Sequence, residues 1–173
     1  MIPKLQKKFD SLERSTNELI NKLQAHTHKE LNKPLEPNKW SAAQHLEHIL
    51  LVEKASIGYI AKKINVSDDL NNTGLKNKWR FSLMKLFFAF PFKKIKAPAV
   101  VANVPDESDL VSIESRWKQE RKGFIEILSL VDQHMLPKEL FKHPFAGKLD
   151  ILQTMDFLTA HLNHHKKIVY KHL

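Results

Sequence analysis

The sequence predicts an all-α fold, an up-and-down bundle of four long helices with one extra short helix. Apolar residues recur at intervals of three, four and seven over several long segments, which is the spacing of helices that bury one stripe. The chain has only 4 glycines, which argues against a fold rich in tight turns. Its 173 residues fit one domain, which we place over residues 1–173.

The first two helices are predicted over residues 2–26 and 41–65. The first is indicated by an apolar stripe, Leu5, Phe9, Leu12, Leu19 and Leu23. The stretch 34–37 begins and ends with proline and marks a loop, because proline does not suit a helix interior and restricts the residue before it. Ser41 and Gln44 then form a capping-box pattern, in which each side chain satisfies a free backbone N–H of the other residue.

The middle of the chain is predicted to alternate between loops and helices. Residues 67–77 are mostly turn formers and indicate a loop. The apolar stretch 79–92 is predicted to be a helix that Pro91 ends. Residues 93–107 hold two prolines and are predicted to be extended, and helical spacing returns over 108–132.

The last helix is predicted to begin after a turn formed by the segment HPFAGKLD, residues 143–150. Asp150 and Gln153 provide a second capping box at its start. The helix then runs almost to the C-terminus. Its inward stripe is formed by Ile151, Met155, Leu158, Leu162 and Val169.

The composition restricts the compartment and the partners. The chain has no cysteine, which removes disulfides, thiolate ligands and a cysteine nucleophile and permits a reducing compartment. The start, MIPKLQKKFDSLERS, lacks the apolar core of an export signal, so we expect a cytoplasmic location. The formal net charge of +9 comes from scattered lysines, which is typical of a solvated surface. No helix with clustered arginines is visible, so no nucleic-acid partner is expected.

Two histidines of the last helix have the spacing of a metal-binding pair. His161 and His165 are four residues apart, so their side chains lie on one face, one turn apart. Both can face the interior, whereas His164 points well away and is predicted to be solvated or paired at the surface. The HExxH motif is absent, because Leu162 follows His161. A buried pair without metal is the alternative.

The helix over 41–65 can supply a third ligand, and periodicity leaves two candidates for it. His45 and His48 both belong to this helix. Its apolar residues include Leu46, Ile49, Leu50 and Ile57. This pattern does not choose between the two histidines, and one of them can simply be a buried histidine that is hydrogen-bonded to a neighbour.

Three motifs follow one another along nearly the whole chain: Lys39-Trp40-Ser41 with His48, then His143-Pro144-x-x-Gly147-Lys148-Leu149, then His161-x-x-His164-His165. Together they resemble the DinB/YfiT-like superfamily of predicted metalloenzymes. The resemblance implies a four-helix bundle whose metal ion is bound by His48, His161 and His165. It also implies that His45 is a core position and that His164 lies outside the ligand set. His143 belongs to the HP turn, where a structural role is expected, and a place near the pocket mouth is the alternative.

Three neutral imidazoles favour Zn²⁺ or Ni²⁺ and leave room for water, which is typical of a catalytic metal site. The resemblance implies an enzyme that activates water, as a hydrolase, or a small-molecule thiol, as an S-transferase. The predicted partner is therefore a small-molecule substrate, with a low-molecular-weight thiol as one candidate. Glu53, five residues after His48, is the predicted catalytic acid–base group, and a surface or helix-pairing glutamate is the alternative.

An alternative function is that of a non-enzymatic metal-binding protein or a dimeric interaction protein. In that version the aromatic and basic segment 79–96 lies on an anionic membrane surface or closes a homodimer interface. Its aromatic and basic side chains include Trp79, Phe81, Phe87, Phe88, Phe90, Phe92, Lys93, Lys94 and Lys96. Aromatic residues at helical spacing more often pack in a core, so membrane contact is not the leading prediction.

Overall fold

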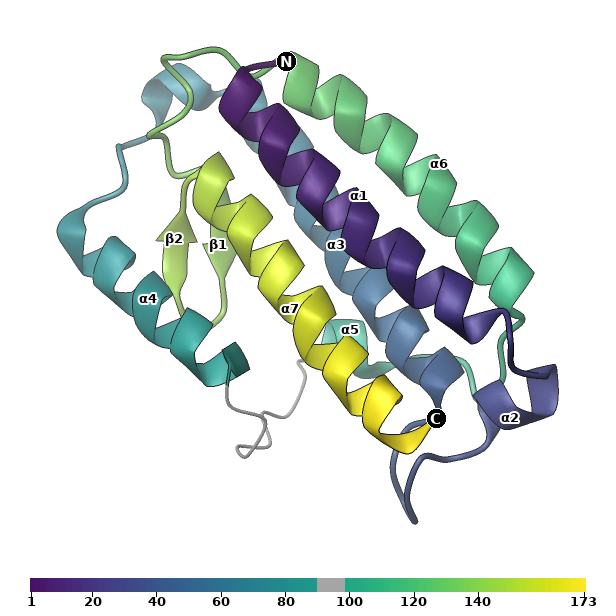
Figure 1. Cartoon of the computed structure of the whole chain (residues 1–173). Coiled ribbons are helices and arrows are strands. Elements are labelled where there is room, and N and C mark those ends of the chain that lie inside the picture. The colour runs from purple at the N-terminus through teal and green to yellow at the C-terminus, as the bar shows by residue number, and fades with distance from the viewer. Residues whose placement is uncertain (90–98) are drawn as a thin grey trace.

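Four long helices lie side by side in the computed structural model, which describes residues 1–89 and 99–173 (Figure 1). They are α1 (Pro3–Leu23), α3 (Ala42–Ile64), α6 (Leu110–Ser129) and α7 (Ile151–His172). Each of α1 and α3 packs against both α6 and α7. The described chain is mostly helical, which confirms the predicted helical class, and it also contains a small two-stranded sheet.

Capping residues begin the two helices that carry the candidate metal ligands. Ser41 Oγ accepts the N–H of Gln44 at 3.2 Å, and the Gln44 side chain accepts the N–H of Ser41 at 3.0 Å. Asp150 and Gln153 form the same reciprocal pair at 2.8 and 3.1 Å. Both predicted capping boxes are confirmed. They satisfy backbone donors that a helix start otherwise leaves free, and so they fix where α3 and α7 begin.

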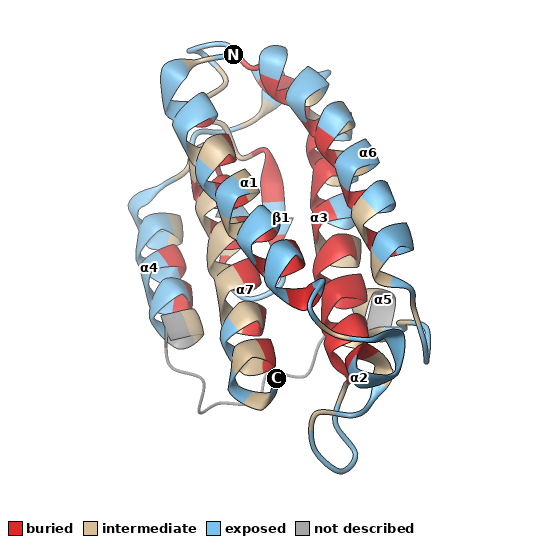
Figure 2. Ribbon diagram, turned by 45° about the vertical axis from the view of Figure 1, so that its right-hand side comes forward, coloured by how far each residue is buried: buried red, intermediate tan, exposed pale blue. Residues whose placement is uncertain are grey.

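The core lies between the long helices, whose inner faces are buried and whose outer faces are exposed (Figure 2). Large side chains with almost no exposed surface fill it, including Trp117, Phe124, Leu5, Leu12, Leu46 and Ile49. None of the helices in the described part of the chain is both long enough and apolar enough to cross a membrane.

Short elements were missed by the sequence patterns. The helix α2 (His28–Asn32) begins at a capping box of Thr27 and Glu30, a pattern that is readable in the sequence. A 3-10 turn, Ser67–Asp69, lies in the predicted 67–77 loop. The prediction of one extra short helix is therefore wrong, since the described chain has several short elements. The sequence patterns did not reveal them because such elements are too short to show a helical periodicity.

The helix α4 (Leu75–Ala89) begins four residues before the predicted start at Trp79. The remainder of that predicted helix, and residues 93–98 of the predicted extended segment, lie outside the described residues. The same holds for the side chains of Phe87, Phe90, Phe92, Lys93, Lys94 and Lys96. Within the predicted extended segment the structure has a short helix, α5 (Ala99–Ala102).

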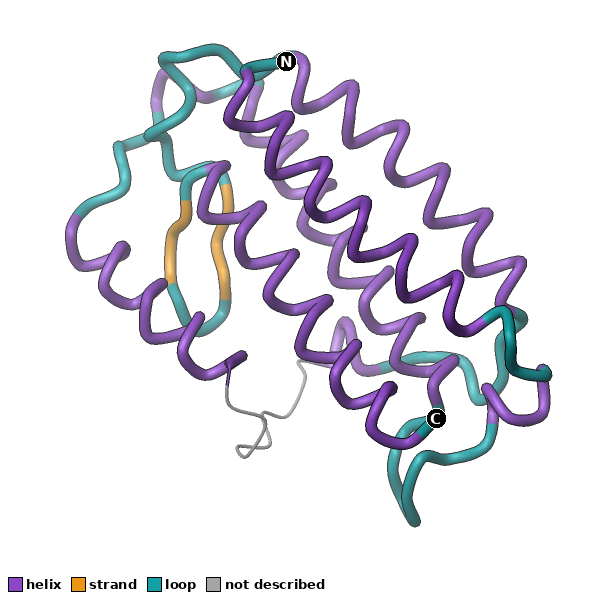
Figure 3. The backbone as a smooth tube through the Cα atoms, in the orientation of Figure 1, coloured by secondary structure: helices purple, strands orange, loops and turns teal. Residues whose placement is uncertain are grey.

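The predicted turn before the last helix is a β-hairpin, with β1 (Phe141–His143) paired antiparallel to β2 (Gly147–Leu149). The hairpin packs against α4 through β2 and against α3 through β1 (Figure 3). Gly147 has a φ of +79°, a conformation that suits glycine, and it pairs with His143 across the hairpin. Strands of three residues are too short for an alternating pattern to reveal them in the sequence.

Candidate metal centre

Three buried histidines from two helices meet at one point. His48 comes from α3, and His161 and His165 come from α7. Nε2 of His161 lies 3.2 Å from Nε2 of His48 and 3.1 Å from Nε2 of His165. One ligand nitrogen of each ring lies within 4.8 Å of the other two. The structure therefore brings together the three residues that the resemblance implied.

These separations suit a divalent metal ion. Nitrogen ligands of a tetrahedral zinc ion, with Zn–N bonds of about 2.0–2.1 Å, lie about 3.3–3.4 Å apart. The two short nitrogen pairs of the cluster, at 3.1 and 3.2 Å, come close to that spacing. Without an ion, two neutral rings at this distance either form an N–H···N hydrogen bond or place two lone pairs in repulsive contact. The group can therefore hold a metal ion.

The ring of His48 is oriented by a backbone carbonyl. Its Nδ1 lies 2.7 Å from the oxygen of Val101 in α5, and this oxygen can only accept a hydrogen bond. The ring proton is therefore on Nδ1, and the lone pair of Nε2 faces the other histidines. Trp40 packs against the same ring, with 5.1 Å between the ring centroids.

A fourth buried histidine, His45, contacts His165 from behind the cluster. The two Nδ1 atoms are 2.9 Å apart. When His165 donates from Nδ1 to His45, the Nε2 lone pair of His165 is left facing His161, as in metal sites whose ligands are oriented by outer partners. The structure thus places His48 in the cluster and His45 beside it, a choice that periodicity alone left open.

Burial keeps these imidazoles neutral. It lowers the pKa of His161 and His165 well below 6.5, and the neighbouring histidines lower both pKa values further. Burial also lowers the pKa of His45 to about 4. For His48 burial lowers the pKa, and the hydrogen bond to the Val101 carbonyl acts in the opposite direction. Because the neutral ring is the form that binds metals, the cluster can take up a cation at neutral pH.

The cluster forms part of the wall of a cavity of about 1300 Å³. The cavity is lined by residues of α3, α4, α7 and the hairpin. Phe88 and Phe157 lie beside His161, with ring centroids 5.8 and 5.7 Å from its own. A cavity of this size accommodates a small molecule, and it gives a metal ion on the three histidines one open side.

A family model for the DinB superfamily matches residues 11–169. The chain belongs to the DinB superfamily. The match includes all three histidines of the cluster, and it confirms the family to which the motifs pointed. No curated protein and no solved structure gives a significant match to the chain.

In this DinB-superfamily chain, Glu53 lies away from the cluster, between α3 and α6. Its carboxylate accepts hydrogen bonds from Trp117 Nε1 at 2.8 Å and from Arg121 at 2.9 and 3.0 Å. Glu53 does not belong to the residues that line the cavity of the histidines. Burial raises its pKa, and the Arg121 guanidinium acts against that rise. This is the position of a helix-pairing glutamate, the alternative to the predicted catalytic role.

Three further histidines line the same cavity, His143, His164 and His172, and helix patterns did not place the first two there. His164 is half-buried rather than solvated, with its ring against Phe88 and His165. Its surface position was predicted from the α7 stripe alone, and α4 covers that side of α7. His143 is buried at the end of β1. In the sequence, only the His143-Pro144 turn indicated that His143 could lie near the pocket.

Proposed function

We propose that this DinB-superfamily protein is a metal-dependent enzyme that activates water, as a hydrolase, or a small-molecule thiol, as an S-transferase. The supporting observation is that three Nε2 atoms converge on one point at the wall of a large cavity. Structural zinc sites are closed by four protein ligands, whereas sites with three ligands and an open side are catalytic. When bound, Zn²⁺ or Ni²⁺ would lower the pKa of a water molecule or thiol beside it.

The residues of the chain would have separate tasks in this function. His48, His161 and His165 would bind the cation, and the capped helices α3 and α7 hold them in place. His45 orients His165 through its Nδ1. Trp40 packs on the rings of both His45 and His48 and shields one side of the cluster from water.

Removing a ligand is expected to remove the metal. The wild-type protein, purified with added Zn²⁺ or Ni²⁺ and desalted, is expected to retain about one ion per chain, and His48→Ala and His161→Ala at least tenfold less. Elemental analysis by mass spectrometry measures this. His134→Ala removes an exposed ring and is the matched control, expected to keep the wild-type metal content. Equal metal in all four proteins would show that the cluster is not a metal site.

Removing the partner of His165 is expected to weaken metal binding without abolishing it. His45→Ala takes away the group that holds Nδ1 of His165, and loss of such an outer partner lowers metal affinity about 10–100-fold. Competition with a chromogenic chelator measures the affinity. His45→Gln keeps a hydrogen-bond acceptor at this position and should recover part of the loss. An unchanged affinity in His45→Ala would mean that His45 only fills space.

Small thiols distinguish the transferase from the hydrolase. If the site activates thiols, cysteine or glutathione is expected to raise the melting temperature of the metal-loaded protein, because a ligand that binds only the folded state stabilises it. The S-methyl derivatives of the same molecules cannot offer a thiolate and are the matched control. Equal stabilisation by thiol and S-methyl derivative would favour the hydrolase.

One observation favours the alternative function, contact with an anionic membrane surface. Four apolar side chains of α4 are spaced along one face and exposed: Leu75, Trp79, Leu83 and Leu86. The helix also carries Lys76, Lys78 and Lys85 and no acidic residue, a charge that complements anionic lipid headgroups. As a second candidate function, we propose that this face of α4 rests on such a surface.

Vesicle co-sedimentation tests this second candidate. At low salt the protein is expected to bind vesicles that contain phosphatidylserine, to bind neutral phosphatidylcholine vesicles much less, and to lose binding when Trp79 and Leu86 are both changed to Ser. Absence of binding to anionic vesicles, or association of two chains through this face instead, would contradict the proposal.

A further inference from the structure

We propose that the cavity beside the three histidines binds an anionic small molecule with an apolar body, and that Arg80 and His143 hold its charged group. This inference names the substrate class of the site described above and therefore rests on the proposed function. Three observations support it: the cavity has apolar walls, its lining has an excess of positive charge, and Arg80 and His143 lie at the same end of the hairpin.

The walls of the cavity are suited to an apolar body. Large apolar and aromatic side chains line it, including Trp40, Tyr59, Met84, Phe88, Phe141 and Phe157. Sites for small molecules combine such walls with a few polar groups that fix the orientation of the ligand. In this cavity the histidine cluster is one polar region, and the end of the hairpin is another.

The charges on the walls favour an anion. Lys39, Arg80 and Lys142 line the cavity, and the carboxylate that lines it, Glu36, lies 3.4 Å from Nε2 of His172. Within residues 1–89 and 99–173, none of these three cations lies in an ion pair with a carboxylate. Positive charge that the protein does not neutralise, in a concave site, raises the local concentration of anions.

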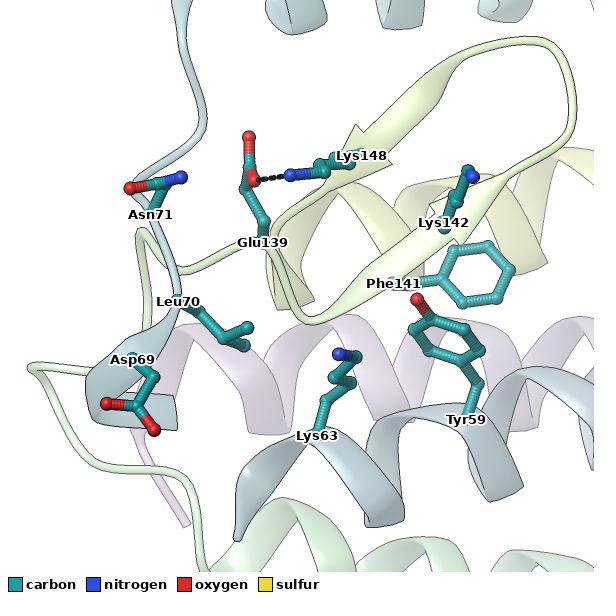
Figure 4. A pocket seen from close by; sticks show the side chains of 9 residues that line it. All are labelled: Tyr59, Lys63, Asp69, Leu70, Asn71, Glu139, Phe141, Lys142 and Lys148. Atoms are coloured by element: carbon teal, nitrogen blue, oxygen red, sulfur yellow. Dashed lines mark hydrogen bonds and ion pairs between the residues drawn. The ribbon is translucent and has the colours of Figure 1, made fainter. Parts of the chain in front are cut away.

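One of the two carboxylates that line the adjoining small pocket, Glu139, is already engaged. This pocket, of about 140 Å³, is lined by residues of the hairpin, of α3 and of the loop after α3 (Figure 4). In it Glu139 accepts from Lys148 at 2.7 Å through one oxygen and from Asn77 at 3.2 Å through the other. Lys142 is not part of this pair, and from the exposed face of β1 it adds positive charge to the cavity lining.

Arg80 and His143 meet at the end of the hairpin. Nη1 of Arg80 lies 3.7 Å from the point where a Cβ on Gly147 would stand. Gly147 is the cross-strand partner of His143, and Lys142 precedes His143 on β1. Arg80 from α4 and His143 from β1 therefore lie at the same end of the hairpin, whereas Lys142, the exposed middle residue of β1, points to the opposite face from His143. An arginine guanidinium presents a planar fork of N–H groups that matches a carboxylate or phosphate.

The His143 ring is fixed as a hydrogen-bond donor. Its Nδ1 accepts the backbone N–H groups of Phe145 and Ala146 at 3.2 and 3.1 Å, so the ring proton is on Nε2. Burial lowers the pKa of His143 to about 4, which is consistent with a neutral ring. With Nδ1 engaged and Nε2 protonated, His143 has no free lone pair for a metal ion, but it can donate to an anionic oxygen.

The test compares two probes of similar shape, phenylbutyrate, which is anionic, and phenylbutanol, which is neutral. Calorimetric titration is done on the full chain after chelation, so that the carboxylate cannot bind through a metal ion, and again after metal loading. The metal-free protein is expected to bind the anion at least about tenfold more tightly than the alcohol, the size of a charge-assisted hydrogen bond.

Substitutions at the end of the hairpin test whether Arg80 and His143 cause the preference for phenylbutyrate over phenylbutanol. Arg80→Gln and His143→Phe are each expected to weaken phenylbutyrate binding about tenfold and to leave phenylbutanol within about twofold. Lys62→Gln removes an exposed charge from α3 outside the cavity lining and is the matched control for net charge. Thermal melts check that each variant is folded. Arg80→Lys, which keeps the charge but loses the planar fork, replaces Arg80→Gln if that variant does not fold.

The outcomes separate this inference from the proposed function. Equal affinity for the two probes, or binding of neither, in a protein that retains metal would overturn the substrate class and leave the metal site intact. A preference for the anion that Lys62→Gln reduces as much as Arg80→Gln would also overturn it. If the preference depends on Arg80 while the protein binds no metal, the cavity is an anion site and the proposed metal-dependent function is wrong.

Discussion

The metal-free protein is expected to lose about 4 kcal/mol of stability or more when the pH is lowered from 7 to 5. Burial lowers the pKa of His45 and His143 to about 4, and the pKa values of His161 and His165 lie well below 6.5. Each ring that is protonated only in the unfolded chain lowers the free energy of unfolding by about 2 kcal/mol at pH 5. His45 and His143, whose pKa values are about 4, together account for about 4 kcal/mol, against a total stability of about 5–15 kcal/mol for a domain, and His161 and His165 act in the same direction.

The direction of the change depends on which state binds more protons. The folded-state pKa of each ring lies below its unfolded value of about 6.5, so at a pH between the two the unfolded chain binds more protons. The stabilisation is therefore fully present above about pH 6.5 and is lost as the pH falls toward the folded-state values, which are about 4 for His45 and His143. A bound metal ion should shift the loss to lower pH, because it binds only the neutral rings.

Thermal unfolding of the chelated protein at pH 7, 6 and 5 measures this effect. The melting temperature is expected to fall by roughly 8–16 °C between pH 7 and pH 5. His45→Leu removes one of the buried rings and should make the fall smaller, whereas His134→Ala removes an exposed ring and should leave it unchanged. A melting temperature that stays constant across this range would show that the buried histidines take up protons without unfolding the protein.

The parts of the fold that were predicted from the sequence are those that local interactions specify. Apolar stripes located the four long helices to within a few residues, and capping residues marked the starts of α3 and α7. The hairpin, α2 and α5 are too short for periodicity to reveal them. Their positions depend on contacts with distant segments, such as that of α4 with β2.

The candidate site shows the same division between local and distant information. The four-residue spacing placed His161 and His165 on one face, but both His45 and His48 are buried, and burial does not select a ligand. The groups that distinguish them, Val101 and His165, are 53 and 120 residues away along the chain. No periodicity in the second helix carries that information, and only the family resemblance pointed to His48.

Glu53 could have been placed from the sequence by helix geometry. At about 100° per residue, the five residues that separate it from His48 turn its side chain about 140° away from that ring. It therefore faces α6 while His48 faces α7, and in the structure it meets Trp117 and Arg121. The apolar run around Glu53 reflects burial between two helices rather than proximity to the cavity.

Removing the Glu53 carboxylate is consequently expected to destabilise the protein rather than to change its chemistry. Arg121 is buried, with only 4% of its surface exposed, and Glu53→Ala would leave its guanidinium with Glu13 and Thr16 as partners. Removing one member of a buried ion pair lowers the free energy of unfolding by about 3–5 kcal/mol. Denaturant unfolding at pH 7 measures the change. Glu114→Ala, which breaks the surface pair with Lys118, is the control and should cost less than about 1 kcal/mol.

Two further substitutions of Glu53 distinguish a helix-pairing role from a catalytic role. Changing both members to apolar residues, Glu53→Leu with Arg121→Met, removes the stranded charge and should recover much of the stability, since apolar replacements of buried ion pairs are often neutral. Metal content and phenylbutyrate affinity are expected to stay at wild-type values in Glu53→Gln, because the carboxylate does not line the cavity. If Glu53→Gln instead kept its stability and lost its response to thiols or its turnover, Glu53 would act in the chemistry, and its pairing with Arg121 would be secondary.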